Sequence, residues 1–191
     1  MALPQFYLTP EKYLEIERGN DFKSEYIDGA MIAMAGGSPR HNRIGANVVR
    51  RLDAALDSAE CTTLSSDQMI WAPWGKYFYA DAAAFCGKGN FFDGILLNPS
   101  VIFEVLSPST ESVDRGVKLS SYRKIESLVH YVLISQDEPH VEVYSKQGDI
   151  WTLDKYDGLG ARVSLTALGI ELLLSDIYNA AFDLPNTVRN S

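Results

Sequence analysis

Two acidic residues stand alone in stretches that are otherwise apolar. Asp81 is the single charged residue of the segment 78–85, and Glu104 that of the segment 101–106. Both segments have the composition of buried strands, where an ionised carboxylate is costly unless it is paired or binds a metal. If the two strands are neighbours, both carboxylates can converge on one divalent cation, and their hard oxygen ligands suit Mg²⁺ or Mn²⁺. The alternative is that Glu104 is a structural glutamate at its strand's end, hydrogen-bonded to a helix terminus.

A lysine can reach the same place from the segment that follows Glu104. Asp114, Lys118 and Tyr122 are spaced by four in a stretch that we expect to be helical, so their side chains share one helix face. The Lys118 ammonium could orient a water molecule or stabilise negative charge on a phosphate, and we expect Tyr122 in the wall of the site. A solvent-exposed Asp114–Lys118 pair is the other interpretation, and the spacing does not choose between them.

Other polar residues near predicted turns and helix starts are weaker candidates. Glu25 precedes an Asp-Gly turn and could supply a third acid, although a solvated charge on a hairpin is the more common arrangement at such a position. His41 lies at the start of a predicted helix together with Arg40 and Arg43, where the three could meet a phosphate. A capping or exposed histidine is the alternative for His41.

The patterns of apolar residues predict an α/β fold with a mixed central β-sheet flanked by helices. We expect helices from Thr9-Pro10 to Gly19, from Ser38-Pro39 to about Leu56 and over 108–126, with a last helical turn near 175–180. Strands are expected in a hairpin over 25–34 and over 61–71, 77–86, 99–106, 129–134, 140–144 and 151–153. Residues after about 183 are expected to be frayed.

Size, charge and cysteine content narrow the class of protein. The chain has 191 residues, which predicts a single domain over 1–191 with its core at about 6–180. A net charge of −8 argues against a protein that coats nucleic acid without selection, but it does not exclude nucleic acid as a substrate. Two cysteines cannot build a disulfide framework or a zinc ribbon, and no apolar run is long enough for a membrane span. We therefore expect a soluble, cytoplasmic protein.

Taken together, the candidate residues and the motifs around them resemble one nuclease family. The segment 101–110, followed by Asp114-x-x-x-Lys118-x-x-x-Tyr122, carries most of the likeness, together with 25–29, His41, Asp81 and 130–134. Over about 6–180 the chain resembles the Uma-type restriction endonuclease family of the PD-(D/E)XK nuclease superfamily.

That resemblance implies a restriction-endonuclease-like fold with a metal-dependent phosphodiesterase site. By position, Asp81 is the aspartate of the first motif and Glu104 the acid of the second. Ala80 stands where the family pattern has proline, and Leu106 where it has lysine, so Lys118 is the candidate for a lysine that has migrated to the adjacent helix.

The hypothesis is therefore an endonuclease that hydrolyses DNA with Mg²⁺ or Mn²⁺ held by Asp81, Glu104 and the Val105 carbonyl. Glu25 lies nearby, Lys118 positions the nucleophile, and Arg40, His41 and Arg43 form a phosphate rim. A nuclease-fold module without activity that binds nucleic acid or a protein is one alternative, and a hydrolase of small phosphoesters is another. The resemblance also implies a homodimer, for which the segment 140–157 offers an exposed edge.

Overall fold

A computed structural model describes residues 7–57 and 60–187. The helical elements are α1 (Pro10–Gly19), α2 (Pro39–Leu56), α3 (Glu111–Val113), the π-helix η1 (Asp114–Lys118), α4 (Leu119–Tyr122), the 3₁₀-helix η2 (Thr166–Leu168) and α5 (Leu174–Ile177). The strands are β1 (Ser24–Ile27), β2 (Ala30–Ala33), β3 (Cys61–Ser65), β4 (Met69–Ala72), β5 (Lys76–Tyr79), β6 (Ala82–Cys86), β7 (Phe91–Phe92), β8 (Ile95–Leu96), β9 (Val101–Leu106), β10 (His130–Ser135), β11 (His140–Gln147), β12 (Ile150–Asp157), β13 (Arg162–Leu165) and β14 (Ile170–Leu173).

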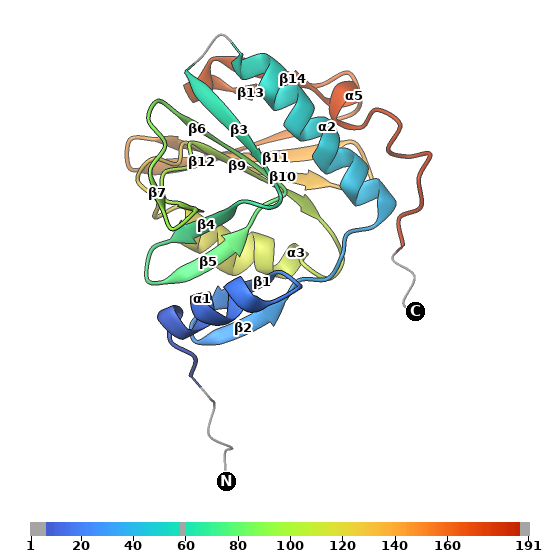
Figure 1. The fold of residues 1–191 in the computed structure, drawn as a ribbon. Coiled ribbons are helices and arrows are strands. Elements are labelled where there is room, and N and C mark those ends of the chain that lie inside the picture. The colour runs from blue at the N-terminus through green and yellow to red at the C-terminus, as the bar shows by residue number, and fades with distance from the viewer. Residues whose placement is uncertain (1–6, 58–59, 188–191) are drawn as a thin grey trace.

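The strands form two mixed six-stranded sheets and a small hairpin, so the predicted α/β class is confirmed (Figure 1). One sheet has the order β2-β1-β5-β4-β8-β7, and the other has the order β12-β11-β10-β9-β6-β3. The helix α2, the hairpin β13–β14 and α5 cover one face of the second sheet. Its other face packs against α4 and against β4 and β5 of the first sheet. We predicted one central sheet, and the structure divides it into two.

The division breaks two of the predicted strands. The stretch 61–71 becomes β3 and β4, and the stretch 77–86 becomes β5 and β6, with each member of a pair in a different sheet. In the second stretch the break falls at Ala80-Asp81, where the chain passes from one sheet to the other. Asp81 therefore lies at a crossing point immediately before β6, and not inside a continuous strand.

The helix α2 has a capped N-terminus and an apolar stripe that packs against the second sheet. The Ser38 hydroxyl accepts a hydrogen bond from the His41 backbone N–H at 3.1 Å, and Pro39 occupies the first turn. An apolar stripe with a spacing of four is fully buried against the second sheet, as the periodicity predicted: Ile44, Val48, Leu52 and Leu56.

The segment after β9 is helical but irregular. The expected helix over 108–126 begins at Glu111, continues through one turn of π-helix over Asp114–Lys118 and ends at Tyr122. A π-helical turn holds one more residue than an α-helical turn, and such turns are frequent at functional sites. Here both ends of the π-helical turn, Asp114 and Lys118, are buried.

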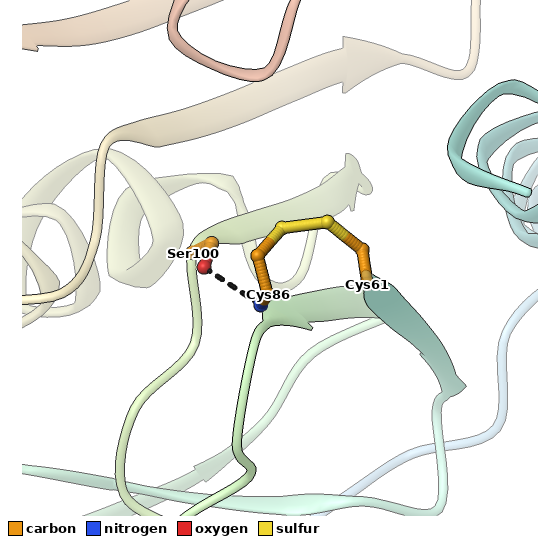
Figure 2. The surroundings of a disulfide bond; sticks show 3 residues. All are labelled: Cys61, Cys86 and Ser100. Carbon is orange, nitrogen blue, oxygen red and sulfur yellow. Dashed lines mark hydrogen bonds between the residues drawn. A yellow bond between two sulfur atoms is a disulfide. The ribbon is translucent and has the colours of Figure 1, made fainter. Parts of the chain in front are cut away.

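The two cysteines form a disulfide that the sequence analysis did not predict (Figure 2). Cys61 and Cys86 lie directly opposite each other on the antiparallel strands β3 and β6. They form one cross-strand link and no larger framework. Because Cys86 ends β6 and Asp81 precedes its start, the disulfide lies at the far end of the strand from the candidate acids.

The C-terminal segment differs from the expected frayed tail as far as it is described. The Pro185 carbonyl accepts from the Arg40 backbone N–H at 3.2 Å, and the Leu184 carbonyl accepts from Arg40 Nε at 3.2 Å. These contacts fasten Leu184 and Pro185 onto the start of α2, because the polar backbone there finds partners. Among the described helices, none combines the length and the apolar character that crossing a membrane requires.

Candidate active site

Asp81 and Glu104 come together as the sequence predicted. The strands β6 and β9 are antiparallel neighbours whose register pairs Ala82 with Phe103, so Asp81 comes level with Glu104. The Asp81 backbone N–H extends this ladder by donating to the Phe103 carbonyl at 3.1 Å. Both acids line a cavity of about 730 Å³. Glu104 lies inside the strand β9 and not at its end, and it is 4% exposed.

Lys118 lies at the centre of a buried cluster of carboxylates. Its Nζ atom is 2.8 Å from Glu25 Oε1, 3.1 Å from Glu104 Oε1 and 3.3 Å from Asp114 Oδ1. The side chains of Lys118 and Asp114 are 5% and 2% exposed. A surface pair between Asp114 and Lys118 is therefore excluded, and the lysine reaches back over the acid of β9 as its spacing allowed.

The cluster carries more negative than positive charge. Three carboxylates surround one ammonium, which leaves two net negative charges if all of them are ionised. Burial raises the pKa of Glu104 well above its usual value, against the opposing attraction of Lys118. Burial also raises the pKa of Asp114. Burial alone would lower the pKa of Lys118, but the carboxylates outweigh it and raise that pKa well above the usual value.

Aromatic side chains close the inner side of this cluster. The Tyr122 hydroxyl donates to Glu104 Oε1 at 3.4 Å, so Tyr122 lies directly beside the acid of β9. The Tyr131 hydroxyl donates to the Asp114 carbonyl at 3.0 Å and fixes the π-helix. The Phe78 ring centre lies 5.8 Å from Lys118 Nζ. These groups exclude water from the lysine and strengthen its charge interactions.

Glu25 is a member of the cluster and not a solvated hairpin charge. The Asp28-Gly29 turn has positive φ at both residues, +48° and +91°, as its sequence predicted. The hairpin packs along β5, and the Tyr79 backbone N–H donates to Glu25 Oε1 at 3.2 Å. Glu25 is only 7% exposed. The burial of Glu25 was not predicted from the sequence, because the neighbour that covers it, Tyr79, is distant along the chain.

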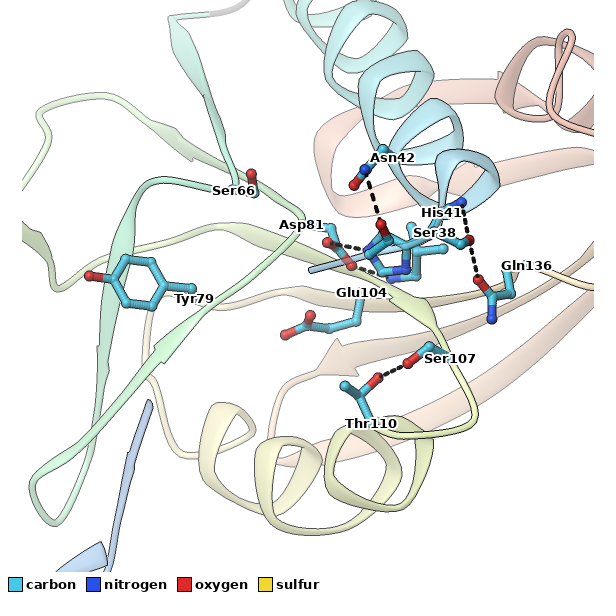
Figure 3. A network of polar contacts seen from close by, with 12 residues as sticks. Ser38, His41, Asn42, Ser66, Tyr79, Asp81, Glu104, Ser107, Thr110 and Gln136 are labelled. Carbon is cyan, nitrogen blue, oxygen red and sulfur yellow. Dashed lines mark hydrogen bonds and ion pairs between the residues drawn. The ribbon is translucent and has the colours of Figure 1, made fainter. Parts of the chain in front are cut away.

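His41 pairs with Asp81 (Figure 3). Its Nε2 atom is 2.8 Å from Asp81 Oδ1, while Asp81 Oδ2 accepts from the Val105 backbone N–H at 2.7 Å. Burial would lower the pKa of His41, but the hydrogen bond and charge of Asp81 raise it above the usual value. The alternative of an exposed histidine is wrong. The buried Nδ1 atom has no hydrogen-bond partner in the described part of the chain.

Arg40 and Arg43 lie on the other side of α2. Arg40 Nε donates to the Leu184 carbonyl, its guanidinium stacks over Phe182, and Arg43 Nε donates to the Asn179 carbonyl at 3.1 Å. Neither belongs to the described lining of the cavity. In this arrangement they hold the C-terminal segment, and their role toward phosphate stays a prediction.

The oxygen atoms around Asp81 suit a hard divalent cation in type and charge. Asp81, Glu104 and the Val105 carbonyl are oxygen donors of the kind that Mg²⁺ and Mn²⁺ prefer. Within a strand, the N–H and C=O of one residue point to the same side, so the Val105 carbonyl faces the edge that Asp81 occupies. A cation there would offset the excess negative charge. Within 7–57 and 60–187, however, no three His, Cys, Asp or Glu side chains are yet grouped so that they could hold a metal.

The two sheets, with the Asp81–Glu104 pair at their junction, form a restriction-endonuclease-like fold. The profile of the Uma2 family, described as "Putative restriction endonuclease", matches residues 10–175, and the chain belongs to this family. The resemblance stated above is thereby confirmed.

Two curated proteins of Synechocystis sp. are close relatives. "Uncharacterized protein sll1609" is 36% identical over 168 residues, which cover 85% of this chain and 95% of that protein. "Uncharacterized protein slr1290" is 32% identical over 174 residues, which cover 90% and 91% of the two chains. A crystal structure of "a putative nuclease belonging to DUF820" from Anabaena variabilis superposes with a TM-score of 0.75 at 19% identity, covering 91% of this chain and 99% of that one.

Proposed function

We propose that the protein is a metal-dependent endonuclease that hydrolyses DNA phosphodiester bonds at the Asp81–Glu104 site. One observation carries the proposal. A buried cluster of three carboxylates on a single lysine adjoins a fourth carboxylate at the wall of an open cavity. Such excess negative charge away from water calls for a cation. The family to which the chain belongs supports nuclease chemistry.

The metal ligands and Lys118 have different roles in the proposed reaction. Asp81, Glu104 and the Val105 carbonyl would hold Mg²⁺ or Mn²⁺, which when bound supplies a more acidic water and neutralises the phosphate. Lys118 stays an ammonium, because the surrounding carboxylates raise its pKa. It therefore orients groups and stabilises negative charge, and it is not a proton acceptor.

Among the described residues, acceptors surround the Lys118 ammonium. Lys118 Nζ carries three N–H groups, and four oxygen atoms lie within 3.4 Å of it, the fourth being the Tyr79 carbonyl. Direct contact with a substrate therefore requires that one of these acceptors turn away. Of the four residues that supply these acceptors, Tyr79, Glu104 and Asp114 line the cavity with Asp81. Substrate contact by Lys118 is thus coupled to a movement of one of these three residues.

Calorimetric titration with Mn²⁺ and Mg²⁺ tests the proposal before any substrate is known. Asp81→Asn and Glu104→Gln should each abolish binding, because each removes a carboxylate ligand while keeping its shape. Asp154→Asn, at an exposed acid of β12, is the matched control and should bind as the wild type does. Binding that survives both site variants would refute the assignment. Metal-dependent nicking of plasmid DNA by wild type, absent in Glu104→Gln, would then establish the reaction.

A nuclease-fold module without activity that binds nucleic acid or a protein is the second candidate. Its support is the engagement of both Asp81 oxygens by His41 and by the Val105 N–H. This candidate predicts no metal binding in the wild type, whether a short DNA duplex, a single strand or neither is present. Metal binding that Asp81→Asn removes would rule it out.

A further inference from the structure

A second cavity continues from the candidate active site along α2. It has a volume of about 460 Å³, and four residues line both cavities: His41, Asn42, Ser66 and Asp81. Figure 3 shows Asn42 and Ser66 above Asp81 and Glu104 below it, so the two cavities meet at the Asp81–His41 pair. An elongated ligand that contacts Asp81 can therefore extend into the second cavity.

One face of α2 forms a wall of this second cavity. The residues that line it are spaced by three and four: Asn42, Gly45, Ala46, Val49 and Arg50. A Cβ atom added at Gly45 would meet nothing within 4 Å, so this part of the wall is open. From His41 to Arg50 the helix rises about 13 Å. This distance is longer than the rise of about 3.4 Å per nucleotide in one strand of DNA.

Arg50 differs from the other arginines of α2, because its side chain has no hydrogen-bond or ion-pair partner among the described residues. The C-terminal segment engages the other three, since Arg40 binds Leu184 O, Arg43 binds Asn179 O and Arg51 pairs with Asp176 at 2.7 Å. Arg50 is exposed and makes no ion pair with any residue in the described ranges. The charged groups that line the second cavity are Arg50, His41 and Asp81.

We propose that the second cavity is a flanking subsite for nucleic acid, in which Arg50 binds a backbone phosphate a few nucleotides along the strand from the one at Asp81. The inference rests on the proposed function and narrows its substrate class. A strand of a few nucleotides covers the rise of about 13 Å between His41 and Arg50, whereas a small phosphoester bound at Asp81 does not extend that far. Ser66 and Asn42 supply polar contacts where the strand passes between the cavities.

Anisotropy of a fluorescein-labelled 16-nucleotide DNA, single-stranded and as a duplex, tests this without added metal. Ala46→Trp fills the second cavity and should weaken binding at least tenfold. Ala54→Trp is the control, since it makes the same change at an exposed position of α2 outside both cavities. Arg50→Gln should weaken binding about fivefold, as expected for one exposed phosphate contact. It should also reduce the salt dependence of single-strand binding by about 0.7 per decade.

Matched measurements separate this subsite from the hydrolytic site. Arg162→Gln, at an exposed arginine of β13, should bind DNA as wild type does. All four variants should hydrolyse bis(p-nitrophenyl) phosphate with Mn²⁺ at the wild-type rate, because that small diester needs only the first cavity. Oligonucleotide binding that is equal in wild type, Ala46→Trp and Arg50→Gln, or absent in wild type, overturns the subsite. If the wild type binds no metal but the oligonucleotide results are as expected, the proposed function is refuted and the flanking subsite is not.

Discussion

Replacing Lys118 by methionine isolates the charge balance of the buried cluster. Methionine keeps the length and apolar stem of the side chain beside Phe78 but removes the ammonium that faces Glu25, Glu104 and Asp114. Breaking a buried ion pair by removing one partner costs about 3–5 kcal/mol. In a domain of this size, each kcal/mol shifts the melting temperature by about 2–4 °C. We therefore expect Lys118→Met to melt about 10 °C below wild type at pH 7.5.

Glu104→Gln is the matched opposite. The amide has nearly the same shape, and its oxygen can still accept from Lys118. Because burial raises the pKa of Glu104 well above its usual value, a neutral group there relieves a cost that the ionised carboxylate imposes. This variant should melt at the wild-type temperature or above it, even though it removes one partner of a buried ion pair.

The pH dependence of the two melting temperatures completes the test. In wild type the pKa values of Glu104 and Asp114 are raised on folding, so the folded state binds more protons and their effect on stability becomes less favourable as pH rises. Without Lys118 the opposing attraction is gone and both pKa values should rise further. The deficit of Lys118→Met should therefore shrink between pH 7.5 and pH 5.5, measured by circular dichroism. A variant that melts within 2 °C of wild type at both pH values would refute the reasoning.

Three further predictions concern the Arg115–Glu142 pair, the disulfide, and the protons released when Mn²⁺ binds. Burial acts to raise the pKa of Glu142, but hydrogen bonds from Arg115 and other cations lower it to about 2. The stability gained is complete above the unfolded pKa of about 4.5 and is lost as pH falls through about 2. Arg115→Gln should therefore cost about 2 kcal/mol at pH 7, and less near pH 2.5, in urea unfolding. Replacing both Cys61 and Cys86 by alanine should cost about 3 kcal/mol, since the disulfide closes a loop with a sequence separation of 25, and should leave Mn²⁺ binding unchanged in calorimetry. Mn²⁺ binding should release protons, because the pKa of Glu104 is raised, so its measured heat should vary with the ionisation enthalpy of the buffer and its affinity should rise from pH 5.5 to 7.5.

The pairing of Asp81 with Glu104 was predictable from the sequence because its signal is local. A single carboxylate in an apolar run is unusual on energetic grounds alone, and both Asp81 and Glu104 carry that mark. The four-residue spacing of Asp114, Lys118 and Tyr122 likewise placed one face of a helix near Glu104. The stripe of α2 and the Asp28-Gly29 turn followed from equally local rules.

The contacts that complete the site depend on segments far apart along the chain. Nothing around Glu25 shows that Tyr79 and Lys118 will cover it, since these residues lie 54 and more positions away. His41 offered a helix start and two arginines, and only the fold turns its ring toward Asp81. The break between β5 and β6 was also not predicted. Apolar residues continue on both sides of Ala80-Asp81, and this pattern predicts one continuous strand.

The position of the lysine follows from these tertiary contacts. In a strand, the residue two after Glu104 lies on the same face, and here Leu106 fills that place within the apolar core between the sheets. Lys118 reaches the same face from a π-helical turn, which the Tyr131 hydroxyl fixes at Asp114 and the Arg115–Glu142 pair ties to β11. A lysine on the strand would be positioned by the sheet alone. In this protein the distance between Lys118 and Glu104 depends on the helix being held, so Arg115→Gln should loosen the lysine as well as the fold.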